Sequence, residues 1–155
     1  QVEIAGENRD RLVPFAKLHR PPGDTPYLET NLAPGELITA FLVPPIPWAR
    51  RSLYLKIRDR ESYEFALASA AVALDLDNGM VRQVRIALGG VSALPWRANA
   101  AEDELQGKQL DDQSLNAAAE TAFAEAQPRE HNAYKAVLGK RTLIRALQQA
   151  ATMEL

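Results

Sequence analysis

The chain has 155 residues, of which 46% are hydrophobic and 25% charged, and its formal net charge is −2. This composition is ordinary for a globular domain, and the weak negative charge gives no general attraction to nucleic acid or to an anionic membrane. There is no cysteine, which excludes disulfides, thiolate catalysis and iron–sulfur clusters held by cysteines of this chain.

The N-terminal segment, as far as about Pro34, is expected to be poor in strands and rich in turns. It begins at Gln1 and not at a methionine, and its first residues alternate as in a strand. This start predicts a piece cut from a longer protein. The prolines at residues 21–26 would interrupt any helix, because proline lacks a backbone donor and fixes φ. We expect this segment to lie over a surface or to close a domain.

Residues 37–43 are apolar except for Thr39 and are predicted to form a strand, which ends at the prolines of residues 44–47. We place a domain boundary in this proline run. The chain is therefore divided into a segment 1–44, which ends one domain, and a domain 45–155. No run approaches the roughly 20 apolar residues of a membrane span, and no signal peptide is recognisable.

The second part is expected to begin with an antiparallel sheet. A strand is predicted over 52–57, and Asp77-Asn78-Gly79 is typical of a tight β-hairpin turn. Residues 64–73 suit a helix by propensity and a strand by continuity with the hairpin. We extend the strand into this alanine-rich stretch, where small side chains would let a helix or sheet approach closely. Apolar residues alternate on both sides of the turn: Val72, Leu74 and Leu76, then Val84, Ile86 and Leu88.

Three helices are predicted after the sheet. The first covers 100–105 and ends at Gly107, the second is capped by Asp112 or Ser114, and the third follows Pro128. The fold class is therefore α+β, a small antiparallel sheet of three to four strands covered by a C-terminal three-helix group. The expected apolar positions are Leu115, Ala119, Ala122 and Ala126 in the second helix, and Val137, Ile144, Leu147 and Ala151 in the third.

Few side chains suggest catalysis. His19 and His131 are far apart, so a histidine-ligated metal site is not expected, and we predict no catalytic residue in this chain. The contiguous acids 102–104 should fan around a helix as a solvated face near its N-terminus. None of the Gly-Gly or Gly-Lys pairs has the spacing of a dinucleotide fingerprint or a phosphate loop.

A basic segment follows the proline run, with one acid, Asp59, in its midst. It can be a charged strand edge that resists aggregation. It can bind nucleic acid, although Tyr54 alone would stack bases. It can also contact an electron-rich cofactor, where a lysine stabilises charge that develops on reduction. The residues alone leave these readings open. The basic residues are Arg50, Arg51, Lys56, Arg58 and Arg60.

Several motifs resemble the FAD-binding (medium) subunit of xanthine dehydrogenase-type and aldehyde oxidoreductase-type molybdenum hydroxylases. Residues 32–38, Leu-Ala-Pro-Gly-Glu-Leu-Ile, resemble the L-x-P-G-E-L-I motif that closes the FAD-binding domain of that subunit. Tyr54-x-Lys56-x-x-x-Arg60 and the alanine-rich stretch after it resemble the start of its C-terminal domain, the carbon monoxide dehydrogenase flavoprotein C-terminal domain. The likeness continues through the hairpin, Trp96-Arg97-Ala98 and the last helix.

The resemblance implies an oxidoreductase fragment that passes electrons from iron–sulfur clusters to FAD and on to an acceptor. By position, the backbone of Ile38 would lie against the flavin, Lys56 beside the isoalloxazine ring, and Arg60 in the following loop. The glycine-rich loops that hold the FAD pyrophosphate in the family are absent here, so this piece alone should bind FAD weakly or not at all. The alternative is a subunit-docking domain that binds no cofactor of its own.

The resemblance also implies partners. These are a molybdenum-cofactor subunit, a 2Fe-2S subunit and the N-terminal FAD domain, with the molybdenum cofactor and iron–sulfur clusters held elsewhere in the complex. Nucleic acid and a membrane span are not expected. Both periplasm and cytoplasm are compatible with the sequence, and the aldehyde oxidoreductase likeness favours the periplasm. The substrate and the terminal electron acceptor are not indicated.

Overall fold

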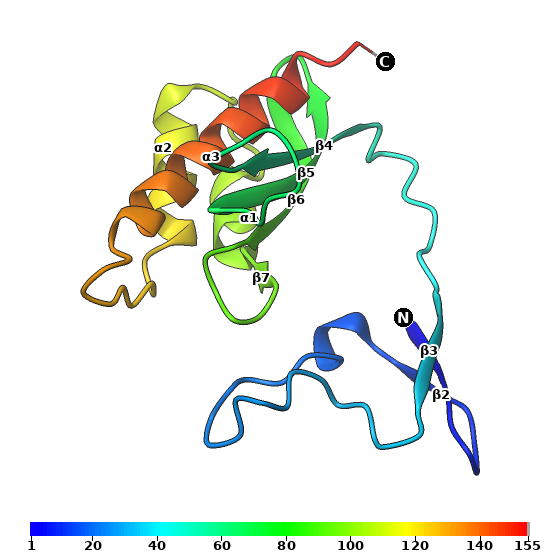
Figure 1. Cartoon of the computed structure of the whole chain (residues 1–155). Helices are drawn as coiled ribbons and strands as arrows, with labels where there is room; N and C mark the ends of the chain where they lie inside the picture. The colour runs from blue at the N-terminus through cyan, green and yellow to red at the C-terminus, as the bar shows by residue number, and fades with distance from the viewer. Residues whose placement is uncertain (155) are drawn as a thin grey trace. The chain divides into compact units, whose positions relative to one another are not determined.

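The computed structural model describes residues 1–154. The chain divides into two compact units, Gln1–Ile46 and a larger one from Pro47 onward (Figure 1). Each unit has its own antiparallel sheet and its own buried cluster. The two are therefore described one at a time.

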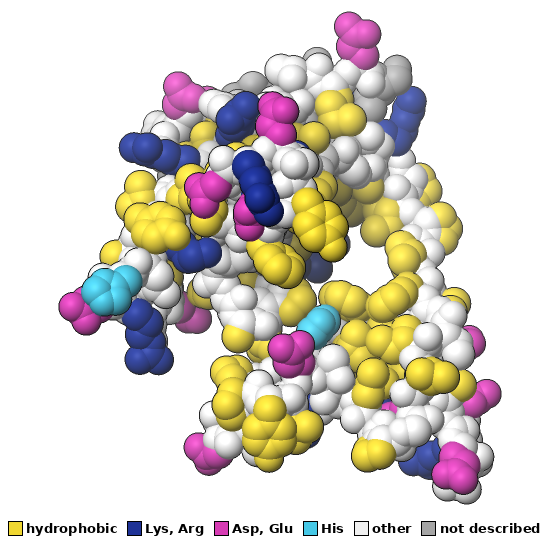
Figure 2. Space-filling model, in the orientation of Figure 1, with side chains coloured by type: hydrophobic (Ala, Val, Ile, Leu, Met, Phe, Trp, Pro, Cys, Tyr) yellow, Lys and Arg dark blue, Asp and Glu magenta, His cyan; other side chains and the backbone are white. Residues whose placement is uncertain are grey.

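The first unit is a three-stranded sheet in the order β2-β1-β3, with a short 3-10 helix, η1. The predicted strand is present as β3, whereas β2 was not predicted, because three residues carry little pattern. Few side chains are buried: Val2, Ile4 and Leu18 form the cluster, and many large apolar side chains are exposed, as the yellow surface in Figure 2 shows. The bounds are β1 Val2–Ala5, β2 Arg11–Val13, η1 Phe15–Lys17 and β3 Leu37–Phe41.

The Leu-Ala-Pro-Gly-Glu-Leu-Ile motif is the turn that leads into β3. Gly35 adopts φ +82°, a left-handed conformation that glycine tolerates without strain. The Glu36 carboxylate accepts hydrogen bonds from Arg11 Nε and Nη2, both at 2.7 Å, and from the Ala33 N–H at 2.7 Å. These bonds, from Arg11 first and Ala33 second, lower the pKa of Glu36 to about 2. The glutamate of the motif thus ties this turn to β2.

The second unit contains a four-stranded antiparallel sheet in the order β4-β5-β6-β7. The hairpin is where the sequence places it, with Asn78 at φ 51° and Gly79 at φ 82° between β5 and β6, the positive values that a type I′ turn requires. The alanine-rich stretch is a strand from Ala68 onward, which confirms the extension of the hairpin. The bounds are β4 Arg51–Ile57, β5 Ala68–Asp77, β6 Met80–Gly89 and β7 Trp96–Arg97.

Three helices cover one face of this sheet (Figure 1), which confirms the predicted α+β fold. They are α1 Asn99–Leu105, α2 Asp112–Ala122 and α3 Tyr134–Ala151. The alternation of the hairpin strands sends every second side chain beneath the helices. The resulting core contains Ala70, Val72, Leu74, Val84, Ile86 and Leu88 from the sheet, and Leu105, Leu115, Leu143 and Leu147 from the helices.

Two details of the helices correct the prediction. The cap of α2 is Asp111, whose side chain accepts from the Ser114 N–H at 2.8 Å while the Ser114 hydroxyl accepts from the Asp111 N–H. In α3, Val137 is 53% exposed. The buried face is rotated away from the predicted stripe, because small residues of α3 such as Gly139 let the helix approach the alanine-rich strand β5 and Phe123 closely. The buried positions of α3 are Gly139, Thr142, Leu143, Ala146, Leu147 and Ala150.

Candidate functional site

A surface hollow lies at the end of β4, where Lys56 meets the loop that leads to β5. It is lined by Lys56, Tyr63, Glu64 and Phe65. Leu53 and Leu55 of β4 pack against the core, so the alternation along the strand directs Lys56 to the other face of the sheet. The lysine is half-buried.

The loop of the hollow exposes two aromatic side chains. Tyr63 is 98% exposed and Phe65 is 91% exposed. Tyr63 also adopts φ 44°, a left-handed conformation that is uncommon and strained for a bulky residue. Arg60 stabilises this shape, since its Nη2 donates to the Tyr63 carbonyl at 3.0 Å and its Nε pairs with Glu64 at 3.0 Å. The arginine therefore acts on the loop itself.

The three residues assigned to cofactor binding from the sequence fall in both units. Lys56 and Arg60 lie at the same end of β4, where Lys56 lines the hollow and Arg60 braces its loop. Ile38 lies in β3 of the first unit and is 36% exposed. Tyr63 and Phe65 were missed, although two aromatic residues in an otherwise polar loop are a signal that the sequence contains.

The other basic residues near β4 do not gather into one patch. Arg51 Nε donates to the Ala151 carbonyl at 3.4 Å, and Arg50 and Arg58 are exposed. Because β4 is an edge strand of the four-stranded sheet, these charges agree with the charged-edge interpretation for most of the segment. Lys56 is the member that faces a hollow.

The predicted solvated acid Glu102 is instead buried, and this prediction was wrong. It is 7% exposed and accepts hydrogen bonds from the Ile86 N–H at 2.7 Å and from Arg97 Nε and Nη2 at 2.5 and 2.8 Å. The bond to Glu102 raises the pKa of Arg97. Ile86 lies on β6 just beyond the residues that pair with the two-residue strand β7, so the Glu102 carboxylate accepts an N–H that β7 is too short to reach. Asp103 beside it is exposed, as expected.

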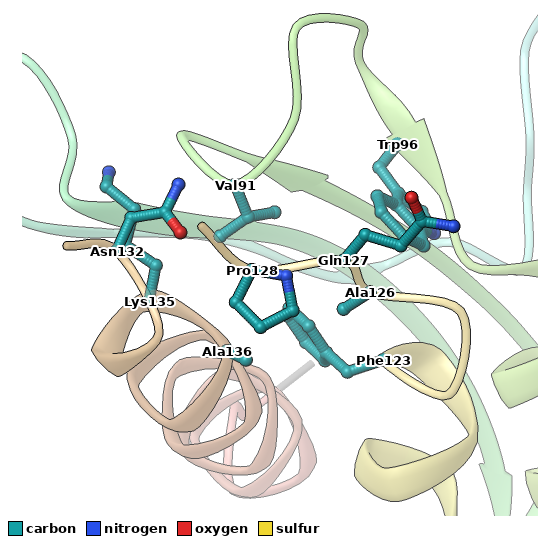
Figure 3. A pocket seen from close by; sticks show the side chains of 9 residues that line it. All are labelled: Val91, Trp96, Phe123, Ala126, Gln127, Pro128, Asn132, Lys135 and Ala136. Atoms are coloured by element: carbon teal, nitrogen blue, oxygen red, sulfur yellow. The ribbon is translucent and has the colours of Figure 1, made fainter. Parts of the chain in front are cut away.

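A smaller hollow, of about 70 Å³, lies between the loop after β6 and the connection from α2 to α3 (Figure 3). Trp96 and Phe123 stack with ring centroids 6.3 Å apart on one side of it. On the other side, Lys135 Nζ donates to the carbonyls of Leu67 and Gly90, both at 2.9 Å. Because the Lys135 ammonium is already hydrogen-bonded to these two carbonyls, we assign this hollow a structural role.

The described residues show neither a metal site nor a membrane-spanning helix. Within residues 1–154, no group of three or more His, Asp and Glu side chains is placed to hold a metal ion. His19 packs edge-on against Phe15, and His131 lies 3.8 Å from Glu130 in the turn before α3. None of the helices of this described part has the length and hydropathy that a membrane crossing requires.

Comparison with known proteins places this architecture. Residues 53–150 match the family described as the CO dehydrogenase flavoprotein C-terminal domain. The chain is 42% identical over 147 residues to the aldehyde oxidoreductase FAD-binding subunit PaoB of Escherichia coli (strain K12), covering 95% of this chain and 43% of that protein. It is 29% identical over 130 residues to the xanthine dehydrogenase FAD-binding subunit of Escherichia coli O157:H7, covering 83% and 43%.

A solved structure gives the same result for the fold. One chain of the Cu,Mo-CO dehydrogenase superposes with a TM-score of 0.84 at 28% identity, covering 96% of this chain and 51% of that chain. The present chain therefore spans less than half the length of the two curated relatives, and about half of the solved chain.

Proposed function

Because the chain belongs to the CO dehydrogenase flavoprotein C-terminal domain family, we propose that it is part of the FAD-binding subunit of a molybdenum hydroxylase. In this role it takes part in electron transfer from iron–sulfur clusters to FAD and on to an acceptor. Residues 1–44 are the end of the FAD-binding domain and 45–155 the C-terminal domain. A molybdenum-cofactor subunit, a 2Fe-2S subunit and an N-terminal FAD domain are its partners.

The observation that carries this proposal is the hollow at Lys56. Enzymes place fixed positive charge where negative charge develops, and the Lys56 ammonium stands at one wall of a hollow whose other walls include two almost fully exposed aromatic rings. Exposed aromatic faces suit a flat conjugated ligand, because they offer large contact area with little conformational freedom to lose. FAD, when bound, supplies the electron-transfer chemistry.

The residues of the chain have distinct roles in this proposal. Lys56 contributes charge, and Tyr63 and Phe65 contribute apolar contact. Arg60 positions the loop through its bonds to Tyr63 and Glu64. The proposed contact of the Ile38 backbone with the flavin rests on the motif resemblance. The sequence contains no glycine-rich phosphate loop, so these contacts serve one part of the cofactor and the pyrophosphate is bound elsewhere.

The test uses a hybrid subunit, in which the N-terminal part of PaoB is joined to this chain at the Pro34-Gly35 turn. The variants Lys56→Met and Lys108→Met are compared by flavin content and by flavin midpoint potential. Loss of one partly exposed charge near the ring is worth about 1 kcal/mol, which is roughly 20 mV for a two-electron couple. We expect Lys56→Met to shift the potential to more negative values by this amount.

The control is Lys108, an exposed lysine that pairs with Glu104, and its replacement should leave the potential unchanged. Equal flavin midpoint potentials for the two variants would show that Lys56 does not lie near the flavin ring. A folded hybrid without any flavin would instead support the alternative, a subunit-docking domain that binds no cofactor of its own.

A further inference from the structure

The side of α3 that faces away from the core has an unusual composition. The helix has 18 residues and contains four Lys or Arg but no Asp or Glu. Tyr134, Val137, Arg141 and Arg145 follow one another at spacings of three and four residues and so share one face. We call these four residues the outward stripe. It lies opposite the buried positions, which centre on Leu143 and Ala146.

The outward stripe is accessible over its whole length. Tyr134 is 52% exposed and Val137 is 53% exposed, and both arginines are exposed. It is also distinct from the proposed flavin site, because Lys56 is directed to the sheet face away from the helices.

Among residues 1–154, the two arginines of the outward stripe have no carboxylate partner. Lys135 of the same helix is bound to two carbonyls and Lys140 pairs with Glu120. Neither Arg141 nor Arg145 lies within salt-bridge distance of a carboxylate of residues 1–154. Like charges four residues apart destabilise a helix, and no basic residue lies in the last turn, where the helix dipole would favour it.

The chemistry of the outward stripe matches that of a protein interface. Tyrosine and arginine are enriched at such interfaces, and lysine and glutamate, which dominate solvated helix faces, are depleted. A guanidinium binds a carboxylate through two parallel hydrogen bonds. A polyanion such as nucleic acid is the weaker match, because half of the stripe is uncharged and the chain has a net charge of −2.

We propose that the outward stripe of α3 docks an acidic surface of a second, different protein chain. Carboxylates of that chain bind Arg141 and Arg145, and its apolar side chains cover Tyr134 and Val137. Within the complex proposed above, that second chain is the adjacent subunit.

The experiment uses the complete protein, tagged and expressed from its own locus in the source organism so that its natural complex assembles. The variant Arg141→Lys/Arg145→Lys keeps both charges and supplies amines, which a zero-length carbodiimide joins to carboxylates in direct contact. We expect cross-linked peptides that connect residue 141 or 145 to Asp or Glu of one other chain. Cross-links only within this chain, or only to a second copy of it, would overturn the proposal.

A charge reversal completes the test. Arg141→Glu/Arg145→Glu should reduce recovery of the cross-linked chain at least tenfold, and raising the salt concentration should reduce it for the unaltered protein. The matched control, Arg82→Glu/Lys108→Glu at the hairpin end, changes the total charge by the same amount and should still recover the partner chain. Unaltered circular dichroism establishes that each variant is folded. Retention of the partner by the α3 variant, or recovery of nucleic acid in its place, sinks the proposal.

Discussion

Replacement of Glu102 should destabilise the second unit far more than the same replacement of its near neighbour Glu104. The Glu102 side chain is 8% exposed and accepts three N–H hydrogen bonds, one from Ile86 and two from Arg97. Glu104 lies on the same helix, is about one third exposed, and pairs with Lys108 on the surface. The two glutamates thus differ in burial and partners but not in chemistry or helix.

The expected magnitude follows from the groups left without a partner. In Glu102→Ala, the Ile86 N–H becomes a buried unsatisfied donor, which costs about 1–3 kcal/mol. The Arg97 side chain is 47% exposed and can be rehydrated, so loss of its ion pair adds only about 1 kcal/mol. We expect a total loss of about 2–4 kcal/mol in the free energy of unfolding. Glu104→Ala should cost at most about 0.5 kcal/mol.

Urea unfolding followed by tryptophan fluorescence measures this difference. Both tryptophans of the chain, Trp48 and Trp96, lie in the second unit, so the signal reports on that unit alone. A double-mutant cycle with Arg97→Ala separates the ion pair from the bond to Ile86. If Glu102→Ala and Glu104→Ala are equally stable, or if Arg97→Ala alone reproduces the whole loss, the assigned role of Glu102 is refuted.

Three further outcomes are expected. The Glu36 carboxyl should titrate by NMR with a pKa of about 2, lowered from the ordinary 4.5. The stability that ionised Glu36 contributes should therefore be complete above pH 4.5 and lost as the pH falls through 2. Arg11→Gln should raise the titration midpoint of Glu36, and an unchanged midpoint contradicts the assignment. Gly139→Ala should lower the free energy of unfolding by about 1–3 kcal/mol despite the better helix propensity of alanine, because the added methyl group would clash with the buried ring of Phe123. Increased stability of this variant in urea would disprove the clash. Lys135→Met should remove two hydrogen bonds, cost about 1–3 kcal/mol, and speed amide hydrogen exchange in 58–67, with unchanged exchange as the contrary result.

Local chemistry made much of the fold predictable. The Asp77-Asn78-Gly79 turn and the alternation around it located the central hairpin, because a tight turn and a period of two are properties of neighbouring residues. The prolines after β3 marked its end for the same reason. The motif resemblance indicated the family. The assignment of Ile38, Lys56 and Arg60 to flavin binding rests on that resemblance and stays a prediction.

The faces of the elements and the partners of charged side chains were less predictable. The apolar periodicity of α3 suggested a stripe that includes Val137, whereas the helix buries Gly139 and Ala146. A close approach between helix and sheet favours small residues, and hydrophobicity alone does not show where such an approach occurs. For the candidate site, the sequence offered Lys56 but not the exposed Tyr63 beside it, because exposure depends on how the loop folds back.

The sequence by itself determined the central hairpin, the three helices that follow it and the family, since each depends on residues close together along the chain. Only the tertiary structure decided that Glu102 is a buried acceptor while Asp103 is solvated, and that Arg60 braces a loop. Burial and hydrogen bonding depend on which groups distant in sequence share a space from which water is excluded. Three adjacent acids are alike in sequence, and only the fold brings one of them, Glu102, to the Ile86 N–H and the Arg97 guanidinium.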